Sequence, residues 1–115
     1  MGSYYTFSHE LILFFTNRNH MDAGAGTNVI KDIPGFSGGA KKLDGEKVHP
    51  TQKPTQLITK LLTDCTEPGD TVLDCFMGSG TTGVCCERMG RNFIGVEIAE
   101  PYFEIAKHRI KQAKT

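Results

Sequence analysis

Short apolar runs and helical patterns alternate in the second half of the chain. The run Val72–Asp74 ends at an acid, and a second run, Phe93–Val96, is followed directly by Glu97. Between the two runs, Thr81–Met89 has helical character and is closed by Gly90. A strand, a glycine turn, a helix and a second strand predict one βαβ unit. The acids at the two strand ends lie where open α/β sheets bind ligands.

Two further helices are predicted on either side of this unit. Pro54 suits the first turn of the earlier helix, because its missing N–H would be unpaired there, and Pro101 opens the later one. In both helices, apolar residues recur at helical spacing and make one stripe. A solvated basic face explains the cations late in the last helix, which suit the negative end of its dipole. The stripes are Leu57, Ile58, Leu61, Leu62 and Cys65, and Tyr102, Ile105, Ala106, Ile110 and Ala113, and the cations are Lys107, Arg109, Lys111 and Lys114.

The first 48 residues follow a different pattern. His9–Phe15 has an unbroken apolar core, whose length and aromatic content favour a buried strand. Residues 16–48 hold many glycines, few apolar residues and nearly balanced charges. They predict a solvated loop with at most a short extended piece at Asn28–Ile33, and a nucleic-acid contact is the less favoured interpretation. The chain therefore divides into a strand region (1–15), this loop, and a βαβ part (49–115).

Composition narrows the class of protein. At 115 residues the chain is one small domain or part of a larger one. A formal net charge of zero excludes the bulk positive field of a self-sufficient nucleic-acid binder, so any basic patch is local. No apolar stretch approaches the ~20 residues of a membrane span. The chain does not open with a basic segment and a long apolar run, so we expect a cytoplasmic protein.

The cysteines offer no metal-binding pattern. They contain no Cys-x-x-Cys pair, and no histidine lies at metal-ligand spacing from them. Small buried thiols in a reducing compartment are favoured over disulfides or zinc. Cys75 falls at a predicted strand, and Cys65, Cys85 and Cys86 fall in predicted helices.

The glycine turn has the spacing of an adenosine-cofactor site. Gly78–Gly83 fits Gly-x-Gly-x-x-Gly between a strand and a helix, and Glu97 follows Gly78 by 19 residues. Glycine allows positive φ and a close approach of the backbone to a ligand. A carboxylate at the end of the next strand can accept hydrogen bonds from ribose hydroxyls. A glycine turn that only packs the helix on the sheet is the less favoured interpretation.

Asp74 selects among the adenosine cofactors. A dinucleotide would place its pyrophosphate at this helix N-terminus, where the carboxylate at the strand tip would repel it. S-adenosylmethionine carries an ammonium group and a sulfonium, which suit Asp74 through a charge-assisted contact. We therefore expect S-adenosylmethionine, with a nicotinamide cofactor as the runner-up.

Two motifs then resemble those of amino-group DNA methyltransferases, which methylate the exocyclic amine of adenine or cytosine. Asp74–Thr82, DCFMGSGTT, resembles their cofactor-binding motif. His49–Pro54, HPTQKP, resembles the segment that precedes it and closes over the methionine end of the cofactor. Gly95–Ile98 followed by Tyr102 resembles the ribose-binding strand and its helix, and His9–Phe15 resembles a late strand of the family sheet.

The order of these motifs is similar to that of the permuted, beta class, in which the cofactor half comes last. Residues 16–48 then occupy the slot of the target-recognition region. The catalytic tetrad of that class contains Pro-Pro followed by an aromatic residue, and no Pro-Pro pair exists in these 115 residues. The resemblance therefore implies the C-terminal part of such an enzyme, without independent methyl transfer to DNA and without a catalytic residue here.

The fold that the resemblance implies is α/β: a partial Rossmann-like sheet of about three strands with helices. Its apolar edges would be unpaired, so we expect self-association or a separate chain that carries the missing half. A non-catalytic remnant that binds cofactor or scaffolds a partner is the alternative. The choice between adenine and cytosine stays open. The cofactor-binding residues that the resemblance implies are Thr51, Gln52, Lys53, Asp74, Phe76, Gly78, Gly80, Thr81, Thr82 and Glu97.

Overall fold

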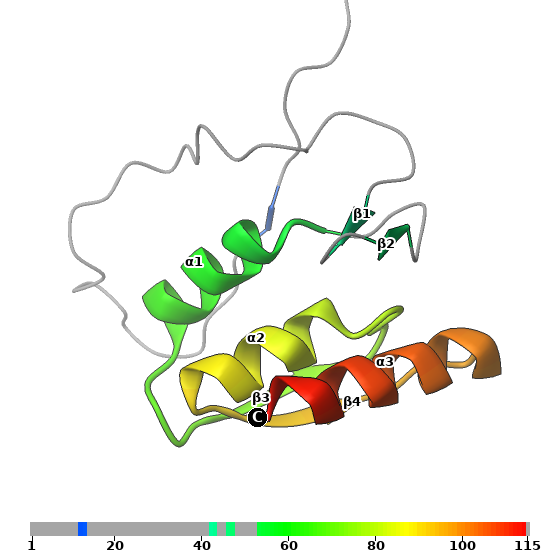
Figure 1. The fold of residues 1–115 in the computed structure, drawn as a ribbon. Coiled ribbons are helices and arrows are strands. Elements are labelled where there is room, and N and C mark those ends of the chain that lie inside the picture. Colours follow the sequence, from blue (N-terminus) through cyan, green and yellow to red (C-terminus); the bar gives the residue numbers. More distant parts are fainter. Residues whose placement is uncertain (1–11, 14–41, 44–45, 48–52, 115) are drawn as a thin grey trace, which may run out of the picture.

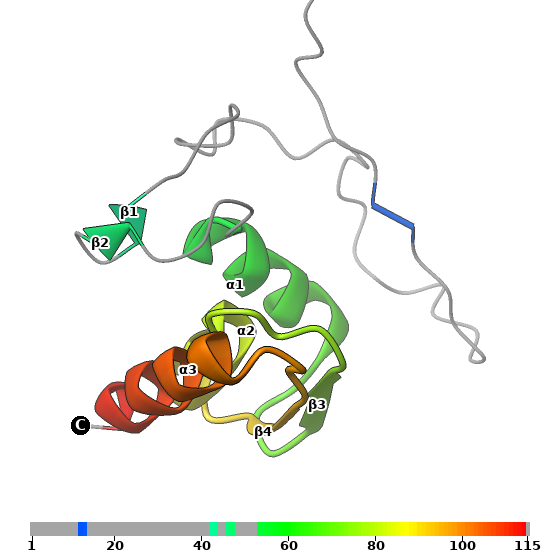
Figure 2. The same cartoon turned by 90° about the vertical axis from the view of Figure 1, so that its right-hand side faces the viewer.

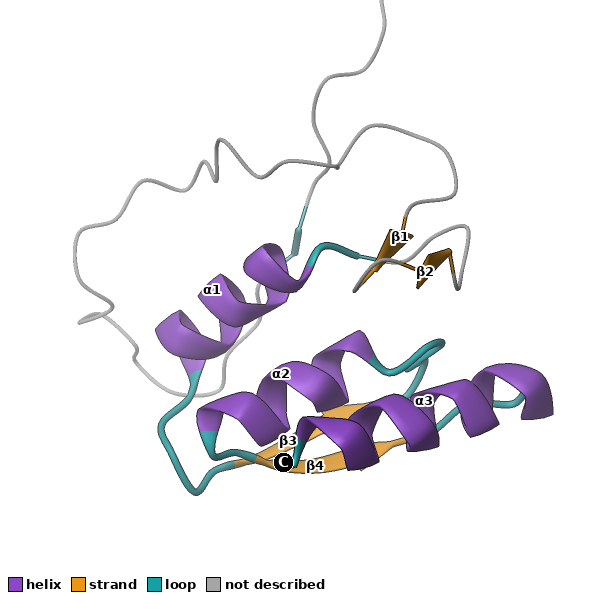
Figure 3. Cartoon of the chain, viewed as in Figure 1, coloured by secondary structure: helices purple, strands orange, loops and turns teal. Residues whose placement is uncertain are grey.

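Most of the described part of the chain forms a two-stranded parallel sheet with three helices on one side of it (Figure 1). The computed structural model describes residues 12–13, 42–43, 46–47 and 53–114. Figure 3 shows the helices stacked above the strands of the parallel sheet. The elements of this unit are α1 (Thr55–Cys65), β3 (Thr71–Asp74), α2 (Thr81–Met89), β4 (Asn92–Gly95) and α3 (Glu100–Ala113).

The predicted βαβ unit is present, and α2 has the predicted bounds. β3 and β4 pair in parallel, with Val72 opposite Phe93 and Asp74 opposite Gly95. The second strand begins and ends one residue earlier than predicted. Beyond β4, the Val96 carbonyl accepts a hydrogen bond from the Met77 N–H (3.0 Å), so this part of the chain is tied to the turn after β3.

The core lies between the helices and one face of the sheet. Leu62 of α1 packs with Cys85 and Cys86 of α2, and Val72 and Phe93 reach this cluster from the two strands. In Figure 2, α2 lies between α1 and α3. Successive strand residues point to opposite faces. Since Val72 and Phe93 face the core, the residues that follow them face away from the helices.

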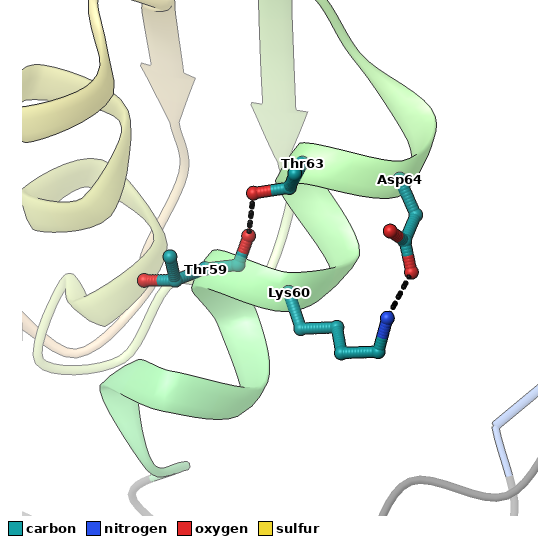
Figure 4. A network of polar contacts seen from close by, with 4 residues as sticks. All are labelled: Thr59, Lys60, Thr63 and Asp64. Carbon is teal, nitrogen blue, oxygen red and sulfur yellow. Dashed lines mark hydrogen bonds and ion pairs between the residues drawn. The ribbon is translucent and has the colours of Figure 1, made fainter. Parts of the chain in front are cut away.

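Helix α1 is amphipathic, as its stripe predicts. Leu57 and Leu62 are buried, while Lys60 and Asp64 form an exposed ion pair of 2.8 Å one turn apart (Figure 4). Such a pair contributes about 0.3–0.5 kcal/mol, so packing and not charge holds the helix in place. Pro54 is the residue before the first helical turn and not within it, and its carbonyl accepts the Ile58 N–H at 3.3 Å.

The N-terminal predictions lie mostly outside the described residues. Ile12 and Leu13 belong to neither helix nor strand and are 53% and 78% exposed, so the strand predicted for His9–Phe15 is not observed at these two positions. The rest of that run and the piece predicted at 28–33 are outside the described residues. Within the segment predicted to be a loop, β1 (Lys42–Leu43) and β2 (Glu46–Lys47) form a short antiparallel pair.

The cysteines are free, but only two of them are buried. Cys85 and Cys86 are 2% and 0% exposed, as predicted for apolar thiols. The prediction was wrong for Cys65 and Cys75, which are exposed, and Cys75 lies in the turn after β3. Burial, followed by the neighbouring Cys85, raises the pKa of the Cys86 thiol to about 11, so this thiol stays protonated at neutral pH.

Two negative findings concern the described residues alone. No helix among them is long and apolar enough to span a membrane. They also contain no group of three or more His, Cys, Asp or Glu side chains arranged to hold a metal ion.

Candidate cofactor site

A cavity of about 470 Å³ lies at the carboxyl ends of β3 and β4, beside the N-terminus of α2. Its wall includes the acid that ends β3, the turn that follows, the first residues of α2, the acid after β4 and the start of α1. This is the edge at which α/β sheets bind their ligands. The lining residues are Lys53, Ile58, Asp74, Phe76, Met77, Gly78, Ser79, Thr81, Thr82 and Glu97.

The structure brings most of the predicted site residues to this one cavity. Lys53, Asp74 and Glu97, from three separate segments, all line it. Thr51 and Gln52 lie outside the described residues. Sequence reasoning missed Ile58, Met77 and Ser79. Ile58 was assigned to the apolar stripe of its helix. Met77 lies before the glycine pattern and Ser79 is a position that the pattern leaves unspecified, so nothing in the spacing marked them.

Glu97 joins the two strand ends. Its Oε2 accepts the Gly78 N–H at 2.8 Å, and its Oε1 accepts the Ala99 N–H at 3.1 Å. The carboxylate therefore fixes the turn after β3 to the segment after β4. Each carboxylate oxygen has two lone pairs, so Glu97 keeps the capacity to accept further hydrogen bonds from a ligand.

Asp74 is held by the turn that follows it. Its Oδ1 accepts the Phe76 N–H at 3.1 Å, two residues further on, which is the geometry of an Asx turn. The carboxylate is half-buried in the wall of the cavity, while the Phe76 ring is 91% exposed. Asp74 and Glu97 thus present two carboxylates to the same space.

The three glycines of the motif differ in what they do. Gly78 has φ 54° and lines the cavity. Gly80 has φ 83° but is not part of the cavity wall, and a Cβ there would stand 2.7 Å from the Cβ of Ala106. A Cβ on Gly83 would collide with Ile110 and Phe93. Of the three, Gly78 is therefore the glycine that lies at the cavity, whereas Gly80 and Gly83 allow α3 and β4 to pack closely.

Arg109 of α3 reaches the same turn from its buried side. Its Nη1 donates to the Ser79 carbonyl at 2.6 Å and to the Ser79 Oγ at 3.1 Å. Arg109 was predicted to lie on a solvated basic face, and that prediction was wrong. Arg109 follows Ala106, a residue of the inward stripe of α3, by three residues. This spacing places both on the same side of the helix and could have indicated the contact.

These groups define the class of ligand. Two carboxylates suit hydroxyl donors and cations, and Lys53 adds one positive charge for an acidic group. A pyrophosphate would meet both carboxylates, which opposes it. A βαβ unit with these groups at its strand ends suits an adenosine cofactor that carries hydroxyls and a positive charge.

Comparison with known proteins identifies the family. The DNA methylase family that covers N6- and N4-specific enzymes matches residues 2–108, and the chain belongs to it. The chain is 42% identical over 74 residues to the Type II methyltransferase M.HinfI of Haemophilus influenzae, a match that spans 64% of this chain and 21% of that protein. It is 48% identical over 63 residues to the Type II methyltransferase M2.DpnII of Streptococcus pneumoniae, a match that spans 55% of this chain and 24% of that protein.

Solved structures agree with this assignment. The complex of M1.HpyAVI with S-adenosylmethionine superposes with a TM-score of 0.57 at 48% identity, over 61% of this chain and 34% of that one. TTHA0409 of Thermus thermophilus, complexed with S-adenosyl-L-methionine, gives a TM-score of 0.51 at 38% identity, over 53% of this chain and 26% of that one. The chain therefore spans about a fifth to a third of the length of these relatives.

Proposed function

We propose that this chain is the S-adenosylmethionine-binding part of a DNA methyltransferase that acts on the exocyclic amine of adenine or cytosine. The observation that carries the proposal is the convergence of Asp74 and Glu97, from two adjacent strand ends, on one cavity beside the Gly78 turn. Family membership and two relatives solved with S-adenosylmethionine support the choice of cofactor.

Each side chain has a role that follows from its charge. Glu97 accepts hydrogen bonds from the ribose hydroxyls, and Asp74 binds the ammonium group of the methionine portion. Lys53 binds the cofactor carboxylate, together with Thr51 and Gln52. Phe76, Gly78, Thr81 and Thr82 line the rest of the cavity together with Ile58, Met77 and Ser79, and Gly80 packs the turn against α3. The bound cofactor supplies an electrophilic methyl group, and the residues here hold and orient it.

The part of the enzyme that binds the target base lies outside these residues. An exocyclic amine inside a duplex is reached only after the base is flipped into a pocket, and the Pro-Pro-aromatic motif that receives it in this class is absent from this sequence. We therefore propose that DNA is the substrate of the completed enzyme. The chain alone should transfer no radiolabelled methyl group from the cofactor to duplex DNA, and incorporation above background would contradict this.

The sheet has an exposed apolar face that suits a contact with the base-binding part of the enzyme. Leu73 of β3 and Ile94 of β4 are 60% and 56% exposed on the sheet face opposite the helices, and Val96 beside them is 51% exposed. Parallel sheets are normally covered on both faces. We propose that the chain carrying the base-binding half covers this face. When that chain is absent, a second copy of this chain covers the face instead.

Calorimetric titration with S-adenosylmethionine tests the cofactor assignment. Glu97→Gln should weaken binding by about tenfold or more, because a charged acceptor for hydroxyls is worth about 1.5–3 kcal/mol. Glu97→Ala should also destabilise the fold, since it leaves the Gly78 and Ala99 amides without their acceptor.

A matched control separates the site from general charge effects. Glu104→Gln removes one exposed carboxylate of α3 and should leave cofactor affinity unchanged. A parallel titration with NAD⁺ should show no binding. Equal affinity of wild type and Glu97→Gln for S-adenosylmethionine would refute the ribose assignment, and binding of NAD⁺ alone would favour the nicotinamide-cofactor class.

A further inference from the structure

We propose that Arg109 is a positioning residue that sets the cofactor-binding turn from its buried side. The inference rests on the proposed function, in which the turn around Gly78 holds S-adenosylmethionine. Arg109 lies on α3, 30 residues after Ser79 in sequence, and donates from one guanidinium nitrogen to both the carbonyl and the hydroxyl of that residue. Ser79 is 3% exposed and lines the cavity, so it has one side toward the ligand and one toward α3.

The turn needs such an outside constraint. Gly78 and Gly80 both have positive φ, of 54° and 83°, and glycine populates many other conformations at little cost. Two local hydrogen bonds restrain it: the Gly80 N–H donates to the Met77 carbonyl at 2.8 Å, and the Gly80 carbonyl accepts the Val84 N–H at 3.0 Å. Neither of these bonds involves the backbone of Gly78 or Ser79, and neutral backbone bonds of this kind offset little of the entropy of fixing two glycines. The working conformation therefore depends on groups from elsewhere in the chain.

Two ionic side chains supply this constraint on consecutive residues. Glu97 accepts the N–H of Gly78 at 2.8 Å, and Arg109 donates to the carbonyl of Ser79 at 2.6 Å. Hydrogen bonds of charged groups are about twice as strong as those of neutral groups. Because one side chain fixes a donor of the turn and the other fixes an acceptor on the next residue, the backbone between them is held in a defined orientation.

The surrounding contacts place Arg109 for this role. Ala106, three residues earlier on α3, is fully buried against Gly80, and Ile110 packs against Gly83. The same helical stripe thus contacts the second and third glycines of the motif and the serine between the first two. The turn is shaped against α3, and Arg109 provides the polar part of that contact.

Arg109→Met tests the proposal, because methionine keeps much of the aliphatic stem and removes the donors. We expect the affinity for S-adenosylmethionine to fall about tenfold, the effect of losing a hydrogen bond to a charged group. Arg109→Lys should lose less, because lysine keeps a cationic donor for the Ser79 carbonyl. Lys107→Met, which removes an exposed cation from the same helix, should bind as tightly as wild type.

Hydrogen exchange distinguishes positioning from a general loss of stability. In ligand-free Arg109→Met and Arg109→Lys, the Gly80 amide should exchange faster, while the Cys86 amide in the core keeps its protection. Ile105→Ala, which truncates another half-buried side chain of α3, serves as a stability control and should bind cofactor normally where the protein is folded. If Arg109→Met does not fold, the cofactor affinity and the hydrogen exchange of Gly80 are both measured on Arg109→Lys.

The outcomes separate the two proposals. Variants of Arg109 that bind S-adenosylmethionine as tightly as wild type, with Gly80 exchange unchanged, would overturn the positioning role and leave the proposed function intact. A wild-type chain that binds no S-adenosylmethionine, yet shows the local change at Gly80 in the variants, would overturn the proposed function and retain the role of Arg109 in the turn.

Discussion

Gly80 and Gly90 flank the same helix with the same backbone conformation but in different surroundings. Their φ values are 83° and 75°, both in the left-handed region that L-residues with a Cβ rarely adopt. A Cβ on Gly80 would stand 2.7 Å from the Cβ and 2.9 Å from the Cα of Ala106, whereas a Cβ on Gly90 would meet no atom within 4 Å. The pair therefore separates the cost of the backbone conformation from the cost of the contact with α3.

The first prediction uses this pair. Gly90→Ala should reduce the free energy of unfolding by about 1–2 kcal/mol, the cost of a left-handed conformation. Gly80→Ala should cost about 1–3 kcal/mol more, because its methyl group displaces α3 and with it Arg109. Urea unfolding measures both variants, and a Gly80→Ala chain as stable as Gly90→Ala would show that the contact with Ala106 is not tight.

Residues that line the cavity could be predicted where the residue type and its place after a strand together indicate a chemical role. Asp74 and Glu97 were predicted to lie close together because each acid follows an apolar run and strand ends meet at one edge of an α/β sheet, and both line the same cavity. Arg109 and Ile58 were not found, because a pattern within one helix does not show which side chain crosses to another element. Gly80 was predicted to approach a ligand because glycine adopts positive φ. Its φ is positive, but the space where a Cβ would stand is occupied by Ala106 of α3.

At the level of elements, Arg91 connects the end of α1 to the end of α2. Its Nε and Nη2 donate to the Oγ1 and the carbonyl of Thr66, at 3.0 and 2.8 Å, and its Nη1 donates to the Met89 carbonyl at 2.8 Å. Thr66 caps α1, and Met89 is the last residue of α2. One guanidinium thus satisfies carbonyls at two helix C-termini, where backbone acceptors have no partner within the helix.

The second prediction follows from this arrangement. Arg91→Met should lower the free energy of unfolding by about 2–4 kcal/mol, because it removes charged hydrogen bonds and leaves half-buried carbonyls unsatisfied. Hydrogen exchange should show the largest loss of protection in α1, which Arg91 ties to the rest of the unit. Arg88→Met, an exposed arginine of α2, is the control. Equal stability of Arg91→Met and wild type would mean that packing alone holds α1.

The elements that were predicted well are those with local stop signals. α2 begins after Gly80 and ends before Gly90, and both glycines fix the boundary through positive φ. α1 and α3 begin beside prolines and have clear apolar stripes. The run His9–Phe15 has no such signals, and an apolar run alone cannot show whether a partner strand is present. The pair β1–β2 was missed because two-residue strands are too short to produce an alternating pattern.

At the scale of the whole molecule, the described residues place helices on only one face of the parallel sheet. The helices cover one face of the β3–β4 sheet, and Leu73 and Ile94 on the other face are more than half exposed. The family relatives are three to five times longer than the stretch that matches this chain. The exposed apolar face and the absence of a Pro-Pro pair both accord with the proposed role of this chain as the cofactor-binding part of a larger enzyme.

The last prediction concerns what this face does when the chain is alone. An exposed apolar face with unpaired strand edges favours association, so the mass of the wild-type chain by light scattering should rise with concentration. Leu73→Lys combined with Ile94→Lys places two charges on the face and should keep the chain monomeric at the same concentrations. Phe103→Lys, which adds a charge to α3 instead, should associate as wild type does.

The S-adenosylmethionine affinity of the double variant should be unchanged, because neither residue lines the cavity. A wild-type chain that stays monomeric at high concentration would show that this face does not mediate self-association.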